Sequence, residues 1–275
     1  FNKKSVWARI SVIAAGPIFN FIMAFVLAVA GKGGVGKTTT AVNLSAAMGE
    51  RGHKTLLVDI DPQGNASSGV GIDRRSVPKS TYELLIGEAG AKEALVQTQF
   101  PNLTILPSSL NLAGAELELV DFDHREARLK TALAPLREEY EYLFIDCPPS
   151  LGMITTNALC AADTLLVPIQ CEYYALEGLS QLMNSVRRVK RQYNERLEIE
   201  GVLLTMYDGR LNLTQQVVEE VKKYFPRKVF RSVIPRSVRL SEAPSYGVPI
   251  MYFDKSNRGT EAYRSLAEEL EKNNR

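Results

Sequence analysis

The clearest chemical signal lies in the stretch GKGGVGKT, from Gly31 to Thr38, which fits the pattern G-x-x-x-x-G-K-[ST] in full. Glycines in this pattern let backbone N–H groups turn inward around a phosphate. The lysine, here Lys37, adds positive charge at the β- and γ-phosphates, and the hydroxyl, here Thr38, ligates Mg²⁺. Helix-forming residues follow, so a helix N-terminus would face the phosphates. The expected phosphate-binding residues are Gly33, Gly34, Val35, Gly36, Lys37, Thr38 and Thr39.

Three carboxylates follow apolar runs that have the character of buried parallel strands. KTLLVDID, residues 54–61, ends in Asp59 and Asp61, and YEYLFIDCPPS, residues 140–150, carries Asp146 after its apolar run. An aspartate at the end of a strand beside a phosphate loop is typically the residue that holds Mg²⁺ through water. We therefore expect Asp146, together with Thr38, to be a metal ligand.

A phosphate loop also needs a strand in front of it. AFVLAVA, Ala24 to Ala30, suits a central parallel strand, but it belongs to an uncharged stretch from Ile10 to Gly31 that is long enough to cross a bilayer. The two interpretations compete for the same residues, and we favour the strand. Residues 1–23 are then an apolar appendage of foreign appearance, and residues 24–275 form one domain.

Charge is distributed unevenly along the 275-residue chain. The net charge is only +2, but residues 187–239 contain 13 Lys/Arg and six Asp/Glu, which favours a local anionic partner. Three cysteines, without metal-binding spacing, indicate reduced thiols in a cytosolic protein. Helices with apolar faces are expected over residues 81–98 and 113–133, a long helix over 176–194 and a polar packing helix over 259–275. The predicted fold is α/β, a doubly wound, mostly parallel sheet with helices on both faces.

The N-terminal segment KSVWARISVIAAGPIFNFIMAFVLA resembles a membrane segment of the site-2-type zinc metalloproteases, with their G-P-x-x-N-F motif at Gly16, Pro17, Asn20 and Phe21. The resemblance ends at about residue 28 and indicates a fusion. That family also requires an H-E-x-x-H motif, which this chain lacks, so protease activity is not expected.

From about residue 24 onward, the chain resembles the ParA/Soj branch of the ParA/MinD ATPases, which are P-loop NTPases. The resemblance is carried by KGGVGKTT with its second lysine, Lys32, and by LLVDIDPQGNASSG, FIDCPPSLG, VPIQCEYYALEGLSQL and VIPRSVRLSEAPSYGVPI. One departure is Ala30-Gly31, where the family usually has Asn-Gln before the signature lysine.

The resemblance implies ATP hydrolysis with Mg²⁺, and it implies roles for several residues. Lys32 would reach the partner subunit's nucleotide in an ATP-bound sandwich homodimer, as an arginine finger does. Asp61 would orient the attacking water or accept its proton. Asp59 is the weaker candidate for that role and is expected to secure the local loop structure instead. Pro235 and Arg236 would lie along the adenine.

The resemblance also implies partners: non-specific double-stranded DNA, contacted by Arg210 and Arg239, and a ParB-like centromere-binding protein that stimulates hydrolysis. Further phosphate contacts are expected from Lys222, Lys223, Arg227, Lys228 and Arg231. The expected location is cytoplasmic and nucleoid-associated, with no membrane partner unless the N-terminal apolar segment serves as an anchor. Two alternatives stay open, a MinD-like membrane-associated positioning ATPase and an inactive fusion that retains only DNA binding.

Overall fold

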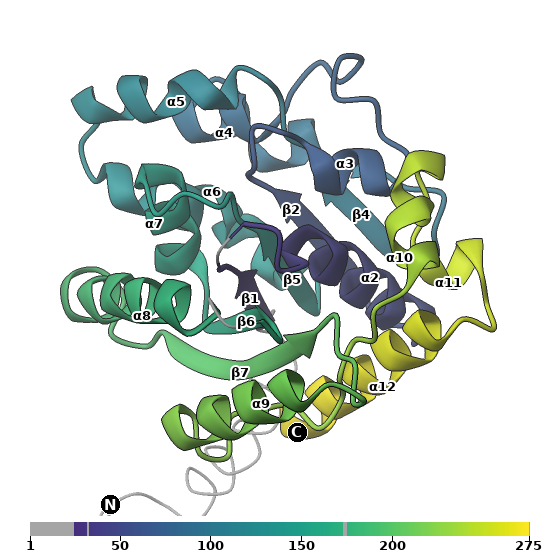
Figure 1. Ribbon diagram of the computed structural model, residues 1–275. Helices are drawn as coiled ribbons and strands as arrows, with labels where there is room; N and C mark the ends of the chain where they lie inside the picture. The colour runs from purple at the N-terminus through teal and green to yellow at the C-terminus, as the bar shows by residue number, and fades with distance from the viewer. Residues whose placement is uncertain (1–24, 32, 173–174, 275) are drawn as a thin grey trace, which may run out of the picture.

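The computed structural model describes residues 25–31, 33–172 and 175–274 (Figure 1). The expected appendage, residues 1–23, lies outside the described residues, as does Lys32. The chain folds around a seven-stranded sheet in the order β3-β4-β2-β5-β1-β6-β7. All strand pairs are parallel except β3 with β4, which confirms the predicted mostly parallel α/β fold. The strands are β1 Phe25–Val29, β2 Thr55–Asp59, β3 Val96–Gln97, β4 Leu103–Leu106, β5 Tyr142–Asp146, β6 Thr164–Gln170 and β7 Glu198–Thr205.

Helices cover both faces of this sheet, as Figure 1 shows. One apolar cluster joins the sheet to α4, α5, α6, α7, α8 and α9, and a second joins it to α2, α3, α10, α11 and α12. The bounds are α2 Lys37–Glu50, α3 Asn65–Gly69, α4 Thr81–Ile86, α5 Leu112–Glu118, α6 Arg128–Leu133, α7 Met153–Ala161, α8 Ala175–Gln192, α9 Asn212–Tyr224, α10 Val238–Glu242, α11 Ile250–Phe253 and α12 Arg258–Asn273.

The disputed apolar stretch before the phosphate loop supplies a central strand, as predicted. β1 lies between β5 and β6, and its side chains alternate between the two apolar clusters, with Val26 in one and Leu27 in the other. At its amino end, the Val26 N–H donates to the Asp163 carboxylate at 2.9 Å, which also pairs with Arg137 at 2.7 Å. Phe25–Val29 therefore belongs to the sheet core and is not part of a bilayer span in this fold.

Two expected helices are wrong in extent. Residues 81–98 contain only the short α4, because Gly87 follows it in a left-handed conformation with φ 86°. A 3-10 turn and β3 complete that stretch. Residues 113–133 divide into α5 and α6, with His124 at φ 51° between them. The other two expected helices, over residues 176–194 and 259–275, correspond to α8 and α12.

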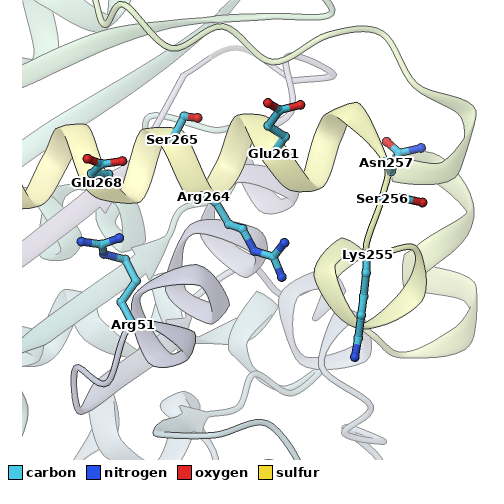
Figure 2. Close-up of a pocket in the computed structure, with 8 residues that line it drawn as sticks. All are labelled: Arg51, Lys255, Ser256, Asn257, Glu261, Arg264, Ser265 and Glu268. Carbon is cyan, nitrogen blue, oxygen red and sulfur yellow. The ribbon is translucent and has the colours of Figure 1, made fainter.

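The described residues include no helix that is long and apolar enough to cross a membrane. Away from the phosphate loop, a hollow of about 360 Å³ lies between α12 and the C-terminal end of α2 (Figure 2). Two of its arginines tie these helices together: Arg264 pairs with Glu50 at 2.6 Å, and Arg51 pairs with Glu271. These ion pairs make the hollow a charged seam between α2 and α12.

Candidate nucleotide-binding and catalytic site

The phosphate-loop residues connect β1 to α2 at the carboxyl edge of the sheet. Gly34 and Gly36 have φ values of 78° and 84°, a left-handed conformation that residues with a Cβ rarely adopt. Gly36 is also the N-cap of α2, so the loop turns directly into the first helical turn, which contains Lys37, Thr38 and Thr39. The described residues of the predicted phosphate site therefore form one continuous turn at a helix N-terminus.

Neighbouring segments hold this loop in place. Thr205, the last residue of β7, donates from its Oγ1 to the Val35 carbonyl at 2.9 Å. A Cβ built on Gly33 would lie 3.5 Å from Pro149, which belongs to the loop after β5. Thr205 gave no motif signal in the sequence, since a threonine at a strand end is common. Its role became visible only when β7 was placed beside the loop.

Lys37 is buried, with 7% of its surface exposed. Burial lowers the pKa of its ammonium group, and the nearby Asp146, Cys147 and Asp61 act in the opposite direction. A buried ammonium group beside carboxylates is a cation held at a fixed place. This is the arrangement expected of a lysine that binds a phosphate.

Asp146 is the last residue of β5, and strand register sets it between Val29 of β1 and Asp59 of β2. Its side chain is fully buried, and neither carboxylate oxygen accepts a hydrogen bond within the described part of the chain. Burial, and then the negative charge of Asp59, raise its pKa well above the usual value, although the nearby Thr38 hydroxyl opposes this. A buried carboxylate whose oxygens accept no hydrogen bond is costly, and the nearby Lys37 ammonium offsets part of that cost.

Asp59 and Asp61 differ in their surroundings. Asp59 accepts hydrogen bonds from the Asp61 N–H at 3.1 Å and from the Ser67 N–H and hydroxyl at 2.8 and 2.7 Å, so it secures the local loop, as expected. Burial raises its pKa to about 6. Asp61 is 6% exposed, and its Oδ1 accepts from the Gln63 N–H at 2.9 Å. Asp61 therefore lies at the same sheet edge as Asp146, with a less constrained carboxylate than Asp59.

Pro235 and Arg236 lie beyond the carboxyl end of β7. Pro235 forms a parallel bridge with Tyr207, and the Arg236 guanidinium lies 3.5 Å from Glu172. The predicted adenine segment therefore follows the same sheet edge as the phosphate loop.

The two arginines predicted to contact DNA are exposed, but each is paired with carboxylates. Arg210 forms a two-point contact with Asp208 at 2.9 and 2.7 Å, which lowers the pKa of Asp208 to about 2. Arg239 contacts Glu242 at 3.0 Å and Asp254 at 3.6 Å. The sequence reasoning missed these acidic partners, although Asp208 is only two residues from Arg210.

The basic residues between positions 187 and 239 are divided between two ends of the sheet. Arg210 follows the carboxyl end of β7, after which α9 returns toward the amino end. Val229 then pairs with Val202 in the middle of β7, so Arg227 and Lys228 lie toward its amino end. There a hollow of about 330 Å³ is lined by Glu200, Arg227, Lys228, Val229, Phe230, Arg231, Glu269, Lys272 and Asn273. Three of the predicted supporting cations, Arg227, Lys228 and Arg231, therefore lie toward the opposite end of β7 from Arg210.

Comparisons with known proteins agree on the family. A family model described as an AAA domain matches residues 23–199. The chain is 56% identical over 242 residues to the sporulation initiation inhibitor protein Soj of Bacillus subtilis, covering 88% of this chain and 96% of the relative. It is 53% identical over 241 residues to the chromosome partitioning protein ParA of Myxococcus xanthus, covering 88% and 85%.

Comparison with solved structures shows that other proteins share this fold. Cobyrinic acid a,c-diamide synthase from Mycobacterium smegmatis, solved with bound ADP and magnesium, is 38% identical with a TM-score of 0.79, over 90% of this chain and 93% of that one. The cell division ATPase MinD of Pyrococcus furiosus is 28% identical with a TM-score of 0.75, over 91% and 99%.

Proposed function

The chain belongs to the ParA/Soj family of chromosome-partitioning ATPases, and we propose that it hydrolyses ATP with Mg²⁺ and binds DNA as an ATP-bound dimer. Release from DNA follows hydrolysis, which a ParB-like centromere-binding protein stimulates. In this proposal the protein works in the cytoplasm on the nucleoid.

The observation that carries the ATPase proposal is the buried Asp146 carboxylate. Within the described residues, neither of its oxygens accepts a hydrogen bond, and it lies near Thr38 and Lys37 at the end of the phosphate loop. Oxygen ligands of this kind suit Mg²⁺, and left-handed glycines, which let backbone amides turn toward a phosphate, suit a polyphosphate. The donor set therefore fits Mg²⁺ and a nucleoside triphosphate.

In this proposal the residues divide the work of phosphoryl transfer. Lys37 and the loop amides hold the phosphates, and Thr38 and, through water, Asp146 hold Mg²⁺, which supplies charge neutralisation when bound. Asp61 orients the attacking water. Lys32, outside the described residues, would act on the partner subunit's nucleotide, and Pro235 and Arg236 would flank the adenine.

DNA binding in this proposal uses Arg210 and Arg239 on the exposed surface. No base-reading motif stands out in the sequence, so contacts go to phosphates and binding is sequence-blind and salt-sensitive. One subunit offers few contacts. A dimer doubles them, so ATP can switch DNA affinity through avidity.

The experiment that tests this function measures binding of the protein to a random DNA duplex over a salt series. The arms are ATP, ADP, and Arg239→Ala in ATP. We expect binding that requires ATP, weakens with salt and falls about tenfold or more in the variant, with a salt slope lower by about one per lost contact.

Two outcomes would contradict the proposal. A folded protein that binds ATP and floats with liposomes, but does not bind DNA in ATP, would indicate a membrane-associated positioning ATPase. A protein that binds DNA equally with and without nucleotide, and does not bind ATP, would indicate an inactive fusion.

A further inference from the structure

A buried amide joins the phosphate-loop helix to the segment that carries Arg239. Asn43 lies on α2, with 3% of its surface exposed. Its Nδ2 donates to the Thr39 carbonyl at 2.7 Å, and its Oδ1 accepts from the Ile250 N–H, also at 2.7 Å. Thr39 directly follows the predicted metal ligand Thr38, and Ile250 is the first residue of α11. The Asn43 amide therefore bonds the first turn of α2 through its nitrogen. Through its oxygen it bonds Ile250, which is 207 residues away in sequence.

The short helix α11 continues this connection to the surface. Its first two residues, Ile250 and Met251, are fully buried, so the helix is anchored in the core. Its last residue, Phe253, places its ring 5.3 Å from the Arg239 guanidinium carbon, and the next residue, Asp254, lies 3.6 Å from the Arg239 Nε. Figure 1 shows α10 and α11 next to each other beside α2. A displacement of α11 would therefore change the Phe253 and Asp254 contacts of Arg239, while the contact with Glu242 within α10 could stay.

A second contact fixes the same segment from the other side. A Cβ built on Gly247, in the turn between α10 and α11, would lie 2.8 Å from the Gly71 Cα, just after α3. Two backbones this close cannot slide past each other without separating. The α10–α11 segment is therefore held between α2, which begins at the phosphate loop, and α3, whose Ser67 binds Asp59.

We propose that Asn43 is a positioning residue that couples the nucleotide state of the phosphate loop to the DNA-binding state of Arg239. The inference rests on the proposed ATP-dependent DNA binding and names its internal connection. ATP draws in the first turn of α2, the amide carries that movement to the start of α11, and Phe253 and Asp254 reset the Arg239 side chain. Because coupling between two ligands is reciprocal, DNA must tighten ATP binding by the same factor through the same amide.

The test compares the parent with Asn43→Ala, Asn43→Asp and Phe253→Leu. Asn43→Asp keeps an acceptor for the Ile250 N–H and removes the donor to Thr39, so it separates the two bonds. Asn102→Gly is the matched control, because it removes an amide hydrogen bond to Gly49 at the opposite end of α2. Asn102 has φ 56°, which glycine adopts without strain. The measured quantities are the Kd for a fluorescent ATP analogue, with and without DNA, and the Kd for duplex DNA in ATP and in ADP.

We expect Asn43→Ala and Phe253→Leu to bind the ATP analogue within about threefold of the parent. In these two variants, the DNA Kd measured in ADP divided by the DNA Kd measured in ATP should be about tenfold smaller than in the parent. This change lies within the usual range of coupling factors. The enhancement of ATP binding by DNA should also fall. Asn43→Asp should lie between the parent and Asn43→Ala in both quantities, and Asn102→Gly should keep both at the parent values.

An unchanged ratio in both Asn43→Ala and Phe253→Leu would overturn the inference. So would loss of ATP binding in Asn43→Ala with an unchanged ratio in Phe253→Leu, because Asn43 would then only support the loop. If the parent itself shows no ATP dependence of DNA binding, the proposed function fails and the inference falls with it, an outcome recognisable from the parent arm alone.

Discussion

Charged side chains in two regions of this molecule differ in burial and in pairing. At the end of the phosphate loop, Asp146 is fully buried, and neither of its oxygens accepts a hydrogen bond among the described residues. On the surface, Arg210 and Arg239 have side chains 88% and 55% exposed, and each lies against a carboxylate. The buried carboxylate oxygens accept no hydrogen bond among the described residues, whereas the exposed guanidinium groups have carboxylate partners that water could replace.

The difference reflects the dielectric environment. A charge in the interior loses hydration and gains strongly from a cation placed beside it, so the surroundings of Asp146 suit the proposed binding of a cation. An exposed ion pair contributes little free energy, since water and salt screen it. If a DNA phosphate replaces the Asp208 carboxylate as the ion-pair partner of Arg210, little free energy is lost, which suits the proposed reversible binding.

The largest expected effect comes from the buried cation at the loop. Lys37→Ala should lower ATP turnover by about 10²–10³-fold, because a fixed charge at the phosphates is lost in a water-poor site. Turnover and binding of a fluorescent ATP analogue measure this, with the exposed Lys92→Ala as control. Turnover within tenfold of the parent would show that Lys37 does not face the phosphates.

Asp146→Asn should change ATP turnover and the free energy of unfolding in opposite directions. We expect turnover to fall about 10²-fold, while the metal-free protein gains about 1–2 kcal/mol in its free energy of unfolding at pH 7. The folded-state pKa of Asp146 lies above its unfolded value. The folded state therefore binds the extra proton between these two values, and the parent loses stability as pH rises through that interval.

Urea unfolding of Asp146→Asn in a metal chelator, at pH 7 and near pH 4, measures the gain and its pH dependence. The gain should be present above the folded-state pKa and small at or below the unfolded value. A variant that is less stable than the parent at pH 7 would mean that the carboxylate has a stabilising partner.

Asp208→Asn tests the exposed side of the comparison. Removing this carboxylate frees the Arg210 guanidinium and deletes a negative charge from the turn proposed to contact DNA. We expect DNA affinity in ATP to rise about three- to tenfold at low salt, with the gain shrinking as salt increases. Filter binding against Asp123→Asn, an exposed acid elsewhere, measures it. Weaker binding would show that Asp208 orients Arg210 for DNA instead of competing with it.

The smallest expected effect concerns the support of the loop. Thr205→Val keeps the side-chain shape but removes the 2.9 Å hydrogen bond to the Val35 carbonyl. A net loss of about 1 kcal/mol corresponds to roughly fivefold weaker ATP binding. Titration with the fluorescent analogue measures it, and Thr104→Val on β4 is the control. Unchanged affinity would mean that the glycine turns alone hold the loop.

Much of the nucleotide site could be predicted because its parts are local. The glycines, Lys37 and Thr38 are contiguous, and a strand that ends in Asp146 points it to the carboxyl edge of a parallel sheet. The extents of α4 and α5 could not be predicted from apolar spacing, because single residues such as Gly87 and His124 adopt left-handed conformations that interrupt the helices. The ion-pair partners of Arg210 and Arg239 were missed because charge counts carry no geometry.

The sequence by itself determined the phosphate loop, the identity of the carboxylates and the parallel α/β class, because each depends on residues that are neighbours in the chain. Only the tertiary structure decided that Phe25–Val29 is a central strand, that Thr205 holds Val35 and that Asn43 joins α2 to α11. It also decided that Arg210 and Arg227 lie toward opposite ends of β7. Those contacts join residues that are far apart in sequence. Their partners are set by strand order and crossover direction, which no local pattern encodes.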